Sequence, residues 1–236
     1  MAIFDSTSGI ELIFRWFHIL AGITWIGLLY YFNFVQVPFM AEATAETKSQ
    51  VTRQLAPRAL WWFRYGALVT LLMGLAIITL KITDYEGGFE LLGTSYGYAI
   101  TSGMVLGLIM FLNVWGVIWP NQKVVIASAE AIAAGGQADP SAADRGRKAM
   151  LASRTNVVFS IPMVFFMAAA SHLPLFAEGS RLVYVLVAVI VVGAFELNAL
   201  MWKGGAPKSY LEKVPSAIIT GFVLWAILYA TLELVG

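Results

Sequence analysis

The sequence has no cysteine and very little charge. Only 12% of its 236 residues are charged, 59% are hydrophobic and the mean hydropathy is +0.77, whereas soluble domains carry about 25% charged residues. The missing cysteines exclude disulfides, thiolate metal sites and thioether-attached haem. A net charge of +1 gives no reason to expect a nucleic-acid partner. The scarcity of charge excludes a water-soluble globular protein and leaves an integral membrane protein.

Six stretches are almost free of charge and long enough to cross a bilayer as helices. About 20 apolar residues span the roughly 30 Å of hydrocarbon, and a backbone in lipid must satisfy its own hydrogen bonds. We therefore predict an all-α polytopic membrane protein that forms a single domain over residues 1–236, with a cytoplasmic hairpin-like loop at about 120–153. The predicted spans are residues 11–37, 60–82, 96–119, 154–176, 180–202 and 214–234.

The basic residues are distributed unequally between the two sides of these spans. Twelve of the fifteen Lys and Arg residues fall in alternate loops on one side, and three fall on the other. Because cytoplasmic loops retain positive charge, we expect a multi-pass protein of the bacterial inner membrane with both termini on the outer, periplasmic side. The N-terminus carries Asp5 and Glu11 and lacks the basic start of a secretory signal. We expect the first helix to be retained.

The two histidines are predicted to lie at similar depth. His18 is seven residues into the first span and His172 is four residues before the end of the fourth, which runs in the opposite direction. Both therefore fall below the outer boundary of the bilayer. Gly22 lies one turn from His18, and Ala168 and Ala169 lie one turn from His172, so each imidazole is flanked by small residues. This spacing leaves room for a flat macrocycle.

We therefore predict that His18 and His172 ligate the iron of haem b from its two faces, an arrangement that favours electron transfer. Arg15, one turn from His18, is positioned to bind a propionate, and Trp25 lies two turns away on the same face. Three alternatives stay open. The histidines could pack helices through hydrogen bonds or bind another metal, and Arg15 could extend to the membrane interface.

Glu196 interrupts the fifth span, and we place it near the middle of that helix. It is either protonated and hydrogen-bonded to Asn198, Asn113 or Asn156, or it is part of a proton path. Pro162 is expected to kink the fourth span, since it removes a helical hydrogen bond.

Two segments carry a resemblance to a known family. They are RWFHILAGITWIGLLYYFNFVQ at residues 15–36 and SRTNVVFSIPMVFFMAAASHLPLF at residues 153–176. Together they resemble the membrane domain of cytochrome-linked bacterial urate hydroxylases, the urate oxidase N-terminal family. The first segment is also similar to the opening helix of a wider haem-binding superfamily that includes HemJ-type protoporphyrinogen oxidases and CopD-type copper proteins.

The resemblance implies that His18 and His172 are haem ligands. In the full-length enzymes a cytochrome c domain follows the membrane domain, whereas this chain ends soon after its last span and has no cysteine. We therefore expect a separate periplasmic cytochrome c or respiratory complex as partner. The leading function is electron transfer by a membrane-bound haem b protein. The alternatives are a urate hydroxylase-like oxidoreductase that uses an external cytochrome c, a non-catalytic accessory subunit of a larger complex or homo-oligomer, and a small-solute transporter.

Overall fold

The structure is a computed structural model that describes residues 3–4, 6–175, 181–201, 203 and 207–235. These residues form helices and no strands, and six of the helical stretches are long and apolar enough to cross a membrane. The predicted all-α chain with six spans is therefore confirmed. The α-helices are α1 (Thr7–Tyr30), α2 (Val37–Glu42), α3 (Ala45–Gln50), α4 (Ala56–Asp84), α5 (Ser95–Leu112), α6 (Trp119–Ala133), α7 (Ala142–His172), α8 (Arg181–Leu200), α9 (Ser209–Glu212) and α10 (Val214–Val235).

Three π-helical segments join α-helices into longer continuous rods, and a 3₁₀ helix over Gly88–Gly93 precedes α5. Each π segment is followed, two residues after its end, by a proline. A proline cannot donate to the carbonyl four residues earlier, and its ring clashes with that carbonyl. The widened π turn accommodates this clash without breaking the helix. The segments are Tyr31–Gln36 before Pro38, Val51–Leu55 before Pro57, and Asn113–Ile118 before Pro120.

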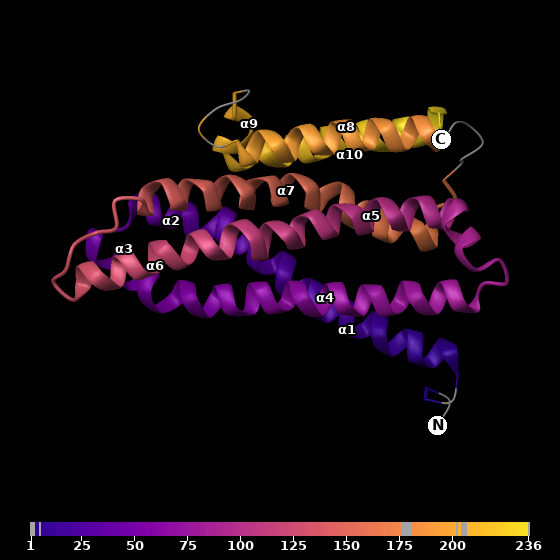
Figure 1. The fold of residues 1–236 in the computed structure, drawn as a ribbon, viewed down its shortest axis with the longest axis horizontal. Helices are drawn as coiled ribbons and strands as arrows, with labels where there is room; N and C mark the ends of the chain where they lie inside the picture. The colour runs from indigo at the N-terminus through magenta and orange to yellow at the C-terminus, as the bar shows by residue number, and fades with distance from the viewer. Residues whose placement is uncertain (1–2, 5, 176–180, 202, 204–206, 236) are drawn as a thin grey trace.

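Four of the six rods are longer than a membrane requires. They contain 36, 40, 39 and 31 residues, whereas the last two contain 19 and 21. At 1.5 Å per residue the long rods exceed the hydrocarbon thickness. They project beyond α9 at the end that holds α2, α3 and the α6–α7 connection (Figure 1). We call this the basic end, and we call the opposite end, where α1 begins and α7 ends, the histidine end.

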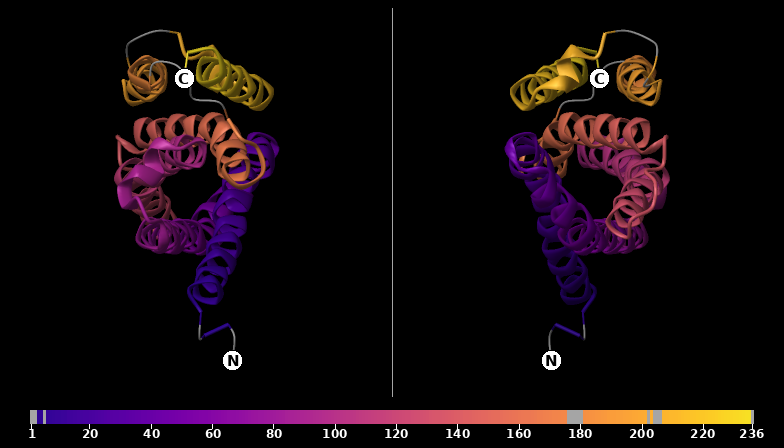
Figure 2. Two further views of the ribbon diagram at one scale, coloured as in Figure 1. Left: turned by 90° about the vertical axis from the view of Figure 1, so that its right-hand side faces the viewer. Right: turned by 90° about the vertical axis from the view of Figure 1, so that its left-hand side faces the viewer.

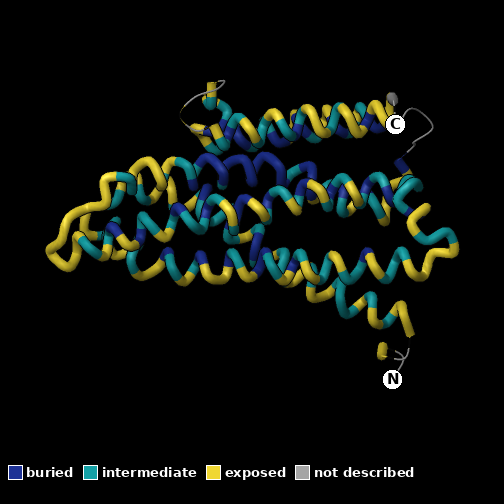
Figure 3. The backbone as a smooth tube through the Cα atoms, viewed as in Figure 1, coloured by how far each residue is buried: buried dark blue, intermediate teal, exposed yellow. Residues whose placement is uncertain are grey.

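Helix α7 is the central element of the bundle. It contacts α5, α6, α8 and α10, while α1 packs along α4. The buried part of the backbone is concentrated in α7 (Figure 3), where Leu151, Phe159 and Phe166 are fully buried. Viewed along the bundle, α8 and α10 form a separate pair over α7 (Figure 2). Because lipid is as apolar as these side chains, close packing and polar contacts hold the helices together.

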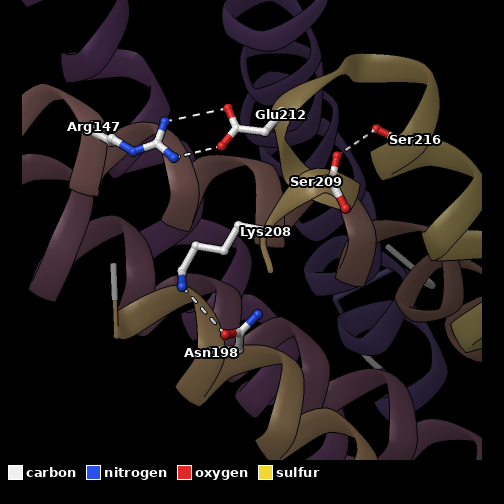
Figure 4. A network of polar contacts seen from close by, with 6 residues as sticks. All are labelled: Arg147, Asn198, Lys208, Ser209, Glu212 and Ser216. Atoms are coloured by element: carbon white, nitrogen blue, oxygen red, sulfur yellow. Dashed lines mark hydrogen bonds and ion pairs between the residues drawn. The ribbon is translucent and has the colours of Figure 1, made fainter. Parts of the chain in front are cut away.

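Polar contacts at the basic end attach the α8–α10 pair to α7 (Figure 4). The Arg147 guanidinium donates two hydrogen bonds to the Glu212 carboxylate, at 2.6 and 3.4 Å. Lys208 Nζ lies 3.5 Å from Asn198 Oδ1, and Ser216 donates to the Ser209 carbonyl at 3.5 Å. The short helix α9 is therefore connected to α7 through Glu212, and the residues at its start are connected to α8 and α10.

Two predicted helix limits were wrong in ways that move functional residues. The fourth span was expected over 154–176, but α7 runs from Ala142 to His172. Leu173 is extended (φ −132°, ψ 114°) because it precedes Pro174, and a residue before proline is disfavoured in the helical region. His172 is thus the last helical residue. Helix α8 ends at Leu200, so Glu196 lies one turn from its end rather than at its middle. The predicted start of the fifth span at residue 180 lies outside the described residues.

Candidate functional site

His18 contacts α4 through a backbone carbonyl. Its Nδ1 lies 2.8 Å from the carbonyl oxygen of Thr70, and the ring is partly buried. A carbonyl only accepts, so Nδ1 must carry a proton, and in the neutral ring the lone pair is then on Nε2. The same arrangement orients metal-binding histidines in other proteins, where one ring nitrogen donates and the other ligates. The contact with Thr70 therefore leaves Nε2 as the ring nitrogen with a lone pair.

The space beside this ring comes from a glycine that the sequence analysis did not select. A Cβ added at Gly74 of α4 would lie 3.0 Å from His18 Cε1 and 3.2 Å from Nδ1. The predicted neighbour Gly22 instead faces Thr70, and its nearest contact would be the Thr70 methyl at 3.9 Å. The imidazole thus depends on the missing side chain of Gly74.

Arg15 is part of a charged cluster at the histidine end. The Glu11 carboxylate accepts a hydrogen bond from Arg15 and lies 3.1 Å from Lys81 Nζ. Tyr96, at the start of α5, lies close enough for both Arg15 and Glu11 to act on it electrostatically. Two cations therefore share one carboxylate. The proposed propionate contact of Arg15 stays a prediction.

Trp25 is 3% exposed, and its indole Nε1–H is buried without a hydrogen-bond partner among the described residues. A buried donor of this kind usually has a partner, because leaving it unpaired costs about 1–3 kcal/mol. The indole is therefore a free donor on the side of α1 that carries His18.

His172 is exposed at the end of α7. The chain just beyond it is fixed to α5, because the Leu175 N–H donates to Ser95 Oγ at 2.6 Å. A hydrogen bond of 2.9 Å between the hydroxyls of Tyr30 and Ser160 sets the register of α1 against α7. Counted from that contact, His18 and His172 are each twelve residues toward the histidine end. The two histidines are therefore equally far along their helices from this contact, but α1 diverges from α7 toward the histidine end and packs on α4 (Figures 1 and 2).

Glu196 belongs to a polar network between helices. Its Oε2 accepts a hydrogen bond of 3.0 Å from Asn113, whose amide also donates to Asn156 Oδ1 at 2.9 Å. Asn156 in turn donates to the Met110 carbonyl at 3.0 Å. Asn198, the remaining predicted partner, donates to the Tyr210 hydroxyl at 3.1 Å instead. The network joins α7 and α8 to the π segment between α5 and α6.

The sequence analysis did not identify a second buried polar cluster, which surrounds Arg154. Arg154 of α7 is 3% exposed, and its Nε donates to Asn33 Oδ1 at 2.8 Å. The Asn33 amide donates to the Leu29 carbonyl and to Ser153 Oγ, both at 2.8 Å. The available signal was the pair of amides Asn33 and Gln36, one turn apart in an otherwise apolar run. Within the part of the chain that the structure describes, no group of three or more His, Cys, Asp or Glu residues could hold a metal ion.

A family model described as urate oxidase N-terminal matches residues 88–229, which is more than half of the chain. The chain belongs to the urate oxidase N-terminal family. In this family member the matched range includes His172 and Glu196, while Arg15, His18, Gly22 and Trp25 precede it. The likeness to the wider haem-binding superfamily rests on residues 15–36 and stays a prediction. No curated protein and no solved structure matches the chain.

Proposed function

We propose that this member of the urate oxidase N-terminal family is a membrane-bound haem b protein that passes electrons to a separate carrier. The observation that carries the proposal is the hydrogen bond between His18 Nδ1 and the Thr70 carbonyl, since it directs the Nε2 lone pair to a ligand. His172, equally far along α7 from the contact between Tyr30 and Ser160, would supply the second protein ligand. Bound haem b would supply reversible one-electron transfer.

The residues around His18 fit such a group. The Thr70 carbonyl holds the ring and raises its basicity, and Gly74 leaves room for the ring against α4. Arg15 and Lys81 share one carboxylate, so one positive charge is left to pair with a propionate. The unpaired Trp25 Nε1–H supplies a further donor on the same side of α1.

Charge indicates the orientation and the partner. Among the described residues, and leaving out Glu196 inside α8, the basic end and its loops hold twelve Lys and Arg residues against six acidic ones, whereas the histidine end holds three against five. By the positive-inside rule, this difference supports a histidine end at the periplasmic face of a bacterial inner membrane. An acidic surface there favours a partner with a basic docking face, such as a periplasmic cytochrome c or a respiratory complex.

A reduced-minus-oxidised visible spectrum of the detergent-purified protein, with extraction of any pigment, tests this function. Sharp low-spin haem b bands at a stoichiometry near one are expected. A colourless protein, even when it is produced with excess haem, would overturn the proposal and favour an accessory subunit of a larger complex.

The family match favours a second candidate, the oxidation of urate or a related purine with an external cytochrome c as electron acceptor. Urate-dependent reduction of cytochrome c by the purified protein tests it. A rate no higher than that of a protein-free sample would count against this activity and leave the electron-transfer role in place.

A further inference from the structure

A cluster of cations and aromatic rings lies where α4 passes α6 at the basic end. Arg64 of α4 is partly buried, and its guanidinium carbon lies 3.7 Å from the centroid of the Trp119 ring on α6. A cation at this distance is attracted by the face of the ring. Lys123, one turn further along α6, places its Nζ 5.7 Å from the same centroid. Two cations from different helices therefore share one indole.

The position of Arg64 is determined by several neighbours. Its guanidinium carbon also lies 5.3 Å from the centroid of the Tyr65 ring and 6.0 Å from that of Trp115. The Trp115 indole donates a hydrogen bond of 3.2 Å to the Arg64 carbonyl, and the Tyr65 and Trp115 rings meet edge to face. An arginine that only extends to water makes no such set of contacts. The guanidinium is therefore held in place by the protein itself.

Within the described ranges, these two cations have no counter-charge. Arg64 Nη1 is buried, and the guanidinium donates no hydrogen bond and has no carboxylate within ion-pair distance. Lys123 forms no ion pair either, and the next acidic residue along α6 is Glu130, seven residues away. Because Arg64 Cζ and Lys123 Nζ lie near one centroid, they are less than about 10 Å apart, and they repel each other. An anion that contacts both would offset this repulsion.

The cluster lies at the depth expected for lipid headgroups. The hydropathy pattern begins the second span four residues before Arg64 and ends the third span at Trp119. On the same side of α4, Trp61 packs on Tyr65, with centroids 4.7 Å apart. Trp61 and its neighbour Trp62 are 45% and 60% exposed. Tryptophan is enriched at the boundary between hydrocarbon and water, so these exposed rings are placed to contact acyl chains while the cations contact a phosphate.

We propose that Arg64 and Lys123 bind the phosphate of an anionic phospholipid where α4 meets α6. The planar guanidinium suits phosphate oxygens, and basic sites between helices on the cytoplasmic side are typical places for anionic headgroups. A free phosphate ion has the same charge but no chains to cover Trp61 and Trp62, so the lipid is the favoured ligand. The proposal does not rest on haem binding. It goes beyond the electron-transfer function, because it assigns a lipid site to the opposite end of the bundle.

Thermal unfolding of the purified full chain in detergent, titrated with lipid, tests the class of ligand. Dioleoyl phosphatidylglycerol and dioleoyl phosphatidylcholine have the same chains and differ in net headgroup charge, while glycerol 3-phosphate supplies the phosphate without chains. We expect phosphatidylglycerol to stabilise the protein at a concentration about tenfold lower than phosphatidylcholine, and glycerol 3-phosphate to have no effect. Equal midpoints for the two lipids would overturn the proposal. Stabilisation by glycerol 3-phosphate as strong as that by phosphatidylglycerol would also overturn it and indicate a site for free phosphate.

Variants locate the site. Arg64→Gln and Lys123→Gln each remove one cation and should weaken the binding of phosphatidylglycerol about tenfold and about fivefold, respectively. Arg58→Gln is the matched control, because Arg58 is exposed on α4 and is turned about 120° around the helix axis from Arg64. It removes the same charge and should change the affinity less than about twofold. An equal loss in Arg58→Gln and Lys123→Gln would show attraction by the whole basic end and overturn the site.

Two further measurements keep this test decisive. Lys123 is exposed, so if Arg64→Gln fails to fold, the comparison of Lys123→Gln with Arg58→Gln decides. Wild-type affinity in Lys123→Gln would then overturn the site. Haem content, measured on the same preparations, should be the same in all of these variants, and it separates a failure of the lipid site from a failure of the electron-transfer function.

Discussion

The two ends of the bundle differ in how completely their polar groups are paired. At the histidine end, Glu11 accepts from Arg15 and lies beside Lys81, and His18 Nδ1 donates to the Thr70 carbonyl, so Nε2 is the ring nitrogen that carries the lone pair. At the basic end, Gln36 and Arg154 are left with buried, unpaired atoms. The charged groups of the first end are therefore paired with one another. The second end keeps polar atoms that have no partner among the described residues.

The largest expected effect is at the histidine end. His18→Ala and His172→Ala each remove one proposed haem ligand and should abolish haem retention. Haem per protein, from pigment extraction, is the measurement. Thr24→Ala is a matched control on α1, because the Thr24 hydroxyl only bonds the Leu20 carbonyl of its own helix. Full haem content in both histidine variants would show that the ligand assignment is wrong.

Stability should depend most on the basic end. Asn33→Ala removes the acceptor of buried Arg154 and the donor to Ser153. It should lower the free energy of unfolding by about 3 kcal/mol, since hydrogen bonds to charged groups contribute more than neutral ones. Thermal unfolding in detergent measures this loss. Asn198→Ala, which removes a half-buried bond to Tyr210, should cost about 1 kcal/mol. Equal losses in the two variants would contradict the special role of the Arg154 cluster.

A pair of glycine variants sharpens the description of the histidine end. Gly74→Ala would push the His18 ring away from Thr70, at a cost of about 1–2 kcal/mol for overpacking, and should weaken haem retention about tenfold. Gly22→Ala has ordinary van der Waals space and should retain haem normally. Haem loss on dilution, followed spectroscopically, compares them. The reverse order would show that the ring leaves α4 when haem binds.

The smallest effect concerns the attachment of α9. The hydrogen bond from Arg147 holds the pKa of Glu212 below its ordinary value. The stabilisation is therefore complete above the ordinary carboxyl pKa and is lost as the pH falls through the lowered folded-state pKa. Both side chains are 43% exposed, so the contribution is below about 1 kcal/mol. Unfolding temperature against pH should drop less steeply on acidification for Glu212→Gln than for wild type, and identical slopes would refute this.

Much of the fold could be predicted from the sequence because the cost of burying charge in lipid is large. The six spans and their alternation follow from where the charges are absent. The lengths of the four long rods could not be predicted, because a hydropathy criterion detects only the segment in lipid. These rods continue beyond that segment with polar residues. The prolines at 38, 57 and 120 were the available sign of the π segments.

The candidate site was less accessible to sequence reasoning. His18 and His172 could be selected because they are the only two histidines. That His18 faces Thr70 and Gly74, rather than Gly22, depends on which face of α1 meets α4, and no local pattern fixes this. The Arg154 cluster was missed for the same reason, since Asn33 and Arg154 are 121 residues apart in sequence.

The π segments also determine where these helices tolerate changes in length. Removing one residue from an ordinary α-helix turns everything beyond it by about 100° and moves each side chain to another face. If the proline that follows is replaced as well, so that α geometry is allowed, removing one residue from a π turn converts that turn to an α turn and leaves the faces on both sides aligned. The residues 31–36 and 113–118 are thus positions where a single-residue deletion, combined with this replacement, can shorten a rod while the contacts at both ends of the bundle are kept.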